Sequence, residues 1–188
     1  AFDENGYVFF TIGDRGVRDN AQDLSNHAGT IIRLHLDGRT PADNPFVNHK
    51  RALPEIWSYG HRNPQGLAYD VKNKRLWTIE HGPRGGDEIN LVEKGKNYGW
   101  PLVSQGLEYY ADIEVGADSM EGMQEPIKVY TPSIAPSDLN IYQASLLPDW
   151  QGDLLTGALK LRHLNRVKLK EGTNGLLLAD EETRYLET

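Results

Sequence analysis

Short runs of apolar residues, each closed by Gly, Pro, Asn or Asp, recur along the whole chain. This pattern predicts short β-strands separated by turns. The only helical segment that we expect is a turn or two at 20–27, and residues 111–122 are typical of an irregular acidic loop. The sequence therefore predicts an all-β fold, with strands at 7–12, 30–36, 55–59, 66–70, 75–79, 88–92, 127–130, 139–142, 153–159 and 164–169.

One kind of strand occurs three times. In each copy a turn is followed by two large apolar residues and a threonine, which is Thr11, Thr78 or Thr156. A repeat of this kind in an all-β chain is typical of propeller blades, which have four strands each. The 188 residues hold about three such blades, whereas closed propellers have about 4 to 8. We therefore expect 1–188 to be one partial β-propeller domain without its N- and C-terminal blades; a β-sandwich with chance triplets is the alternative.

Composition and charge narrow the functional classes. The chain is 38% hydrophobic and 25% charged, as soluble globular proteins are. Its net charge of -7 and lack of a basic cluster argue against nucleic acid as a partner. With no cysteine, disulfides and thiolate metal sites are excluded. Because no long apolar run occurs, we expect no membrane span, and the first residues lack the order of a signal peptide.

Polar side chains gather between the strands at 55–59 and 66–70. Here Pro64 and flanking glycines set a turn, while Arg62 and Asn63 present a guanidinium and an amide. These groups suit an anionic ligand that also carries carbonyls. A capped turn with a surface arginine is the simpler structural reading of the same residues.

A second polar group lies at 81–88 and 97–100. A glycine–proline pair, Gly82 and Pro83, offers backbone carbonyls, and Asp87 and Glu88 add anionic oxygens. Calcium prefers such ligands, although the loop is not an EF-hand and an acidic turn without an ion is equally compatible. The six histidines show no pair at metal-ligand spacing, which argues against zinc.

These motifs together resemble the soluble pyrroloquinoline quinone (PQQ) dependent aldose sugar dehydrogenases, relatives of soluble quinoprotein glucose dehydrogenase. The resemblance covers nearly the whole chain and rests on 11–16 (TIGDRG), 57–66 (WSYGHRNPQG), 80–90 (EHGPRGGDEIN) and 94–101 (KGKNYGWP). It implies a six-bladed β-propeller that oxidises the C1 hydroxyl of an aldose to the lactone by hydride transfer to the quinone. It also implies an external electron acceptor and a periplasmic or secreted location.

The resemblance assigns roles residue by residue. PQQ is a tricarboxylate, and its implied contacts are Arg62, Asn63, the neighbouring Gln65, and Lys160. The carbonyls of Gly82 and Pro83 match those that hold the calcium bound to PQQ. Two further residues, Glu88 and Tyr98, match a second calcium position, Tyr98 through its backbone oxygen.

The chain also departs from the family pattern. The family's catalytic histidine lies upstream of the segment matching 6–14, so no residue here is assigned as the base. The family's cofactor-gripping arginine pair lies beyond the matched region, and Thr131 stands where soluble glucose dehydrogenase has a pocket tryptophan. Three hypotheses follow: a sugar dehydrogenase fragment, a half-propeller completed by a homodimer, and a non-catalytic calcium-stabilised fragment or binding module.

Overall fold

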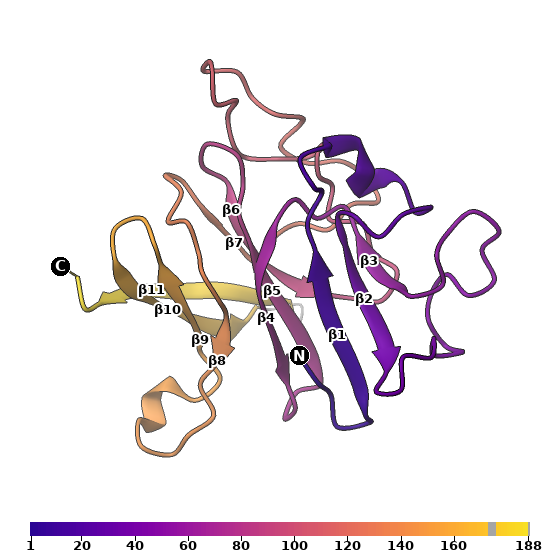
Figure 1. Ribbon diagram of the computed structural model, residues 1–188. Helices are drawn as coiled ribbons and strands as arrows, with labels where there is room; N and C mark the ends of the chain where they lie inside the picture. The colour runs from indigo at the N-terminus through magenta and orange to yellow at the C-terminus, as the bar shows by residue number, and fades with distance from the viewer. Residues whose placement is uncertain (173–175, 188) are drawn as a thin grey trace.

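The computed structural model describes residues 1–172 and 176–187 and contains three antiparallel sheets (Figure 1). Within each sheet, strands that follow one another along the chain are paired. In the described part of the chain, no helix is long and apolar enough to cross a membrane. The sheets contain β1 Tyr7–Ile12, β2 Thr30–His35 and β3 Ile56–Tyr59; β4 Pro64–Asp70, β5 Arg75–Glu80, β6 Asp87–Val92 and β7 Lys128–Tyr130; and β8 Asn140–Ile141, β9 Leu154–Ala158, β10 His163–Glu171 and β11 Leu177–Tyr185.

The threefold repeat has a structural counterpart, because the three threonines lie in β1, β5 and β9. The Thr78 hydroxyl donates to the Gly66 carbonyl of the neighbouring β4 at 2.8 Å, and the Thr156 hydroxyl donates to Asp138 ahead of β8. In the first sheet Phe2 forms a β-bridge with Val8 of β1, and it thus takes the place that β4 has beside β5 in the second sheet. The three sheets are therefore equivalent units, and the all-β propeller prediction of about three blades is confirmed.

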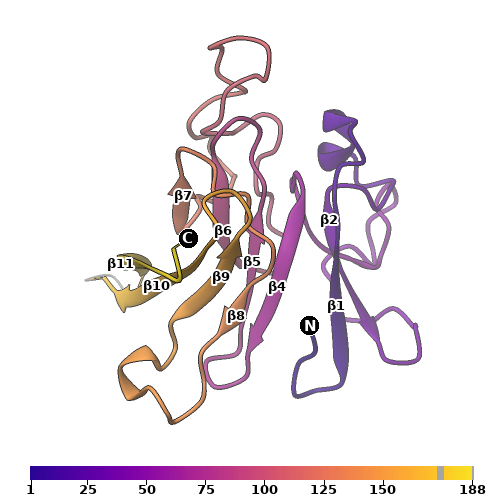
Figure 2. The ribbon, with the colours of Figure 1, turned by 60° about the vertical axis from the view of Figure 1, so that its left-hand side comes forward.

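The inner segments of the three sheets face one another. Strand β4 contacts both β1 and β8, as Figure 2 shows from the side. Residues 1–2, 67–69 and 138–141 line one cavity of about 400 Å³. This convergence of inner strands is the arrangement of blades around a propeller axis.

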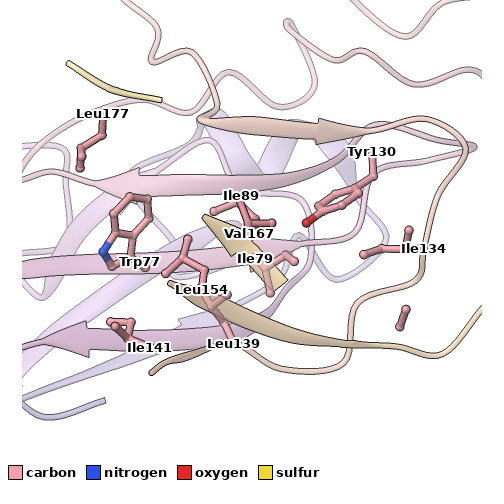
Figure 3. Packing of buried hydrophobic residues seen from close by; sticks show 11 residues of the cluster. Trp77, Ile79, Ile89, Tyr130, Ile134, Leu139, Ile141, Leu154, Val167 and Leu177 are labelled. Carbon is pink, nitrogen blue, oxygen red and sulfur yellow. The ribbon is translucent and has the colours of Figure 1, made fainter. Parts of the chain in front are cut away.

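Apolar side chains fill the spaces between the sheets. The larger core joins the second and third sheets, with Trp77, Ile79 and Ile89 facing Leu154 and Val167 (Figure 3). A smaller core between the first two sheets centres on four buried residues, Phe9, Ile31, Leu76 and Val92. The burial of each such side chain contributes about 1.5–3 kcal/mol to the stability of the fold. Because these side chains lie between neighbouring sheets, their packing fixes the relative positions of the strand ends in those sheets.

One expectation is wrong, and one strand was not predicted. Instead of a helix at 20–27, the chain forms a short 3₁₀ helix, η1 (Arg18–Gln22), because the Asp23 carboxylate accepts the Ser25 N–H at 2.9 Å in a competing turn. Strand β11 was not predicted from the sequence. A second 3₁₀ turn, η2 (Pro148–Trp150), precedes β9.

Candidate cofactor and metal site

The ends of several strands meet at one rim of the sheets. The Asp14 N–H, after β1, donates to the Arg62 carbonyl at 2.8 Å, and the His81 N–H, after β5, donates to the Asn63 carbonyl at 3.1 Å. The motifs at 11–16, 57–66 and 80–90, which lie far apart in the sequence, therefore form one continuous surface.

A buried polar network shapes the turn that carries Arg62. The Ser58 hydroxyl and the Glu80 carboxylate lie 2.9 Å from the two ring nitrogens of His61, which is fully buried. The second Glu80 oxygen accepts the Arg62 N–H at 2.7 Å. Gly60 (φ +77°) opens the turn, where a Cβ would lie 2.1 Å from the Asn97 side chain. Glu80 thus fixes the backbone from which Arg62 projects.

The Arg62 guanidinium is held by neutral groups only. Its Nη1 donates to the His81 carbonyl at 3.1 Å, and its Nη2 donates to the Tyr109 hydroxyl at 3.2 Å. It lies over the Trp100 ring, 5.3 Å from the centroid. Arg62 makes no ion pair with the carboxylates of the described residues, so its charge is available to an anionic ligand.

The other predicted cofactor residues lie along the same rim. The Gln65 side-chain amide donates to the Asn63 side-chain oxygen at 3.1 Å, so the two act as a pair. A cavity of about 260 Å³, lined by residues 13–16, Arg62 and Asn63, opens beside them. Lys160 follows β9, and its N–H donates to the Ile134 carbonyl at 3.1 Å.

Hydrogen bonds connect the Lys160 turn with the Arg62 turn. Pro136 forms a bridge with Ala158, and its carbonyl lies 2.7 Å from Nε2 of His81, which in turn bonds Arg62. The backbone of Lys160 therefore belongs to the same rim. Among the described residues, no hydrogen bond or ion pair joins the Lys160 side chain to Arg62 or Asn63.

A small cavity beneath the rim contains two carboxylates, of which Glu80 is buried and Glu88 is half-buried. Glu80 and Glu88 are opposite each other on β5 and β6, and both line the cavity together with Gly82 and Tyr98. Burial, followed by the charge of Glu80, raises the pKa of Glu88 to about 8. The Asn90 Nδ2 group donates a hydrogen bond to each carboxylate, at 3.2 Å to Glu80 and at 3.3 Å to Glu88.

This cavity fits a hard cation. Its free volume of about 10 Å³ is room for one water-sized occupant, and a divalent ion would compensate two desolvated acids. The Tyr98 hydroxyl is already bonded to the Leu91 carbonyl at 2.6 Å, so only its backbone oxygen is available. Among the described residues no group of three His, Asp or Glu side chains could hold a metal; backbone oxygens would have to complete the ligand set.

The loop of Gly82 and Pro83 is packed too tightly for larger residues. A Cβ on Gly82 would lie 2.2 Å from the Gly86 carbonyl, and one on Gly106 would lie 2.6 Å from the Pro83 ring. The Gly82 N–H donates to Asp87 at 3.0 Å. This packing fixes the backbone carbonyls that the sequence predicts as calcium ligands.

Asp87 has a different role from the anionic ligand suggested by its position in the motif. It is fully buried, and its carboxylate also accepts hydrogen bonds from the Ser133 hydroxyl at 2.7 Å and from the N–H groups of Ile134 and Ala135 at 2.8 and 3.0 Å. Its oxygens are thus used in joining β6 to the segment ahead of β8. Sequence reasoning missed this role and that of Glu80; only their place in a polar motif marked them.

Three meandering sheets around one axis place the chain in the class of β-propeller proteins. The sequence pattern of the glucose/sorbosone dehydrogenase family matches residues 1–187. The chain belongs to this family.

Known proteins show the same relationship. Aldose sugar dehydrogenase YliI of Escherichia coli is 42% identical over 97% of this chain and 51% of its own length. The crystal structure of the soluble E. coli aldose sugar dehydrogenase in its apo-form superposes with a TM-score of 0.88, at 39% identity, over 99% of this chain and 53% of that one. The PQQ-bound aldose sugar dehydrogenase of Streptomyces coelicolor gives 0.77, at 29% identity, over 100% and 48%. The chain spans about half the length of the curated relatives it matches.

Proposed function

We propose that this chain forms part of the PQQ and calcium site of an aldose sugar dehydrogenase. The reaction is oxidation of an aldose C1 hydroxyl to the lactone, with electrons passing to an external acceptor. The observation that carries this proposal is Arg62, which has no ion pair with a described carboxylate and is held at the rim by the buried Ser58–His61–Glu80 network. The PQQ-bound relative from S. coelicolor supports the choice of cofactor.

The anionic cofactor would be held from several sides. Arg62 and Lys160 supply positive charge, and Asn63 supplies an amide that Gln65 orients. When bound, PQQ supplies an ortho-quinone that accepts the C1 hydride. The hydroxyl proton needs a base, and we assign that role to none of the described residues.

Calcium would serve at two places. The carbonyls of Gly82 and Pro83 would hold the ion that binds the cofactor, where a cation acts as a Lewis acid. Glu88 and the backbone oxygen of Tyr98 would hold a second ion in the small cavity beside Glu80. That second ion would offset the charge of the buried acids and so stabilise the turn that carries Arg62.

The test is isothermal titration of PQQ into calcium-loaded protein, with Arg62→Gln as the variant. We expect calcium-dependent binding that weakens about tenfold or more in the variant, because a hydrogen bond to a charged group contributes about 1.5–3 kcal/mol. Equal affinity in both proteins would contradict the proposed cradle. Calcium-dependent stabilisation without any PQQ binding would instead favour a calcium-stabilised binding module.

We further propose that residues 1–188 act as a single partial propeller domain, and that the protein works in the periplasm or outside the cell. The first part is supported by the two cores that join all three sheets. It predicts one cooperative unfolding transition, and two separate transitions in urea would contradict it. The location is supported by the family resemblance, and fractionation of the source cells would test it.

A further inference from the structure

Arg15 has a backbone conformation that is unusual for its residue type. It follows β1 with a φ of +59°, in the left-handed region that non-glycine residues seldom occupy. The only hydrogen bond from its side chain joins Nε to the Gly13 carbonyl at 3.2 Å, among the described residues. Such strain persists where the surrounding structure holds it, and it is frequent at binding sites.

Arg15 and Arg62 line the same cavity of about 260 Å³, together with Asn63. Neither arginine forms an ion pair with a carboxylate of the described residues, although the chain carries a net charge of -7. The single acid that lines the cavity is Asp14. Its two oxygens already accept the Trp100 Nε1–H and the Gly16 N–H, each at 2.9 Å. Two arginines and one asparagine thus line a cavity whose one lining carboxylate, among the described residues, is already hydrogen-bonded.

We propose that Arg15 is a second arginine of the anion site and binds a carboxylate of the cofactor together with Arg62. This inference rests on the proposed function. A guanidinium pairs with a carboxylate through two parallel N–H donors, which gives both strength and orientation. PQQ carries three carboxylates, so more than one cation is needed to hold it. Arg15, held in its left-handed turn after β1, lines the same cavity as Arg62 and would add a further cation to Arg62 and Lys160.

The experiment compares Arg15→Gln with Arg62→Gln in calcium-loaded protein, with Arg51→Gln as the matched control. Arg51 is exposed and makes no ion pair in the described part of the chain. Two ligands are titrated calorimetrically, PQQ and its trimethyl ester, which lacks the carboxylate charges. We expect Arg15→Gln to weaken PQQ binding about tenfold and to leave ester binding within about twofold, while Arg51→Gln changes neither.

The outcomes separate this inference from the proposed function. If PQQ binds the unchanged protein and Arg62→Gln weakens it, but Arg15→Gln does not, only the role of Arg15 is overturned. If Arg15→Gln instead weakens the binding of an acidic sugar and leaves PQQ binding unchanged, the anion belongs to the substrate and the inference is also overturned. If the unchanged protein does not bind PQQ, the proposed function itself fails.

Discussion

Replacement of Asp87 by asparagine should be among the most damaging single-atom changes in this chain. The fully buried carboxylate accepts four hydrogen bonds, from Gly82, Ser133, Ile134 and Ala135. Asparagine keeps one acceptor oxygen and turns an NH₂ group toward a donor. Hydrogen bonds to a charged group contribute about 1.5–3 kcal/mol each. Losing one and weakening three should therefore cost about 3–5 kcal/mol, a large part of the ~5–15 kcal/mol that stabilises a typical domain.

The assay is equilibrium unfolding in urea, with Asp118→Asn as the control. Asp118 is exposed, so its substitution should change the free energy of unfolding by less than about 0.5 kcal/mol. Asp87→Asn should lower the midpoint without changing the slope with denaturant, because the surface exposed on unfolding is the same. A cost below about 1 kcal/mol for Asp87→Asn would refute the reasoning, since it would mean that the four bonds contribute little.

Three further predictions concern the site and its supporting loop. Calcium should raise the urea midpoint of the unchanged protein more than that of Glu88→Gln, because the variant removes the carboxylate ligand of one of the two proposed ions. Gly82→Ala should cost about 1–3 kcal/mol from overpacking, more than Gly38→Ala, where nothing lies within 4 Å of the added Cβ. The hydrogen bond from Arg18 holds the pKa of Glu108 below its ordinary value of 4.5. Their ion pair should therefore be present above pH 4.5 and be lost as the pH falls through that lowered pKa. Protection of residues 106–114 from hydrogen exchange would measure this loss.

Each of these has a matched control. Glu121→Gln, at an exposed acid, should keep the full calcium response, and loss of the response there would contradict a specific site. In Gly38→Ala the left-handed φ of +84° is the remaining cost, so an equal loss at both glycines would contradict the crowding argument. Glu108→Gln should remove the pH dependence of the protection factors of residues 106–114, and an unchanged profile of those factors would show that another group opens the loop.

The strands that the sequence predicted are those with buried faces. Trp77 and Ile79, for example, flank the repeat threonine in a short apolar run and are buried in the core. The three repeat threonines also indicate which strands of the blades are equivalent. Strand β11 lacks this signal, because only Leu177 of its residues is buried and much of the rest is charged. It is stabilised by pairing with β10 and by ion pairs such as Lys128–Glu182 at 2.7 Å. Such contacts join residues that are far apart in the sequence, so they produce no local sequence pattern from which a strand could be predicted.

The residues of the candidate site also fall into two groups, those that a local sequence motif predicts and those that it does not. Arg62 and Asn63 were predictable because their turn is a local motif with glycines and a proline, and the structure places both at the rim. The role of Glu80 was not, since it depends on bonds to His61 and to the Arg62 N–H, 19 and 18 residues away. Asp87 was expected to offer oxygens to an ion, and its donors at 133–135 could not be inferred from neighbouring residues.

Trp100 shows why the rim has to be considered as a unit. The guanidinium groups of Arg18 and Arg62 lie 5.4 and 5.3 Å from the centroid of its ring, and its Nε1–H donates to Asp14. Arg18 in turn forms a two-bond ion pair with Glu108 at 2.6 and 2.7 Å. The connection between β6 and β7, which rises beyond the sheets in Figure 1, is thus tied to the first sheet. Because these contacts cross between sheets, the position of the Arg62 guanidinium depends on how two blades pack. A change in that packing would therefore displace the proposed cofactor residues without altering any of them.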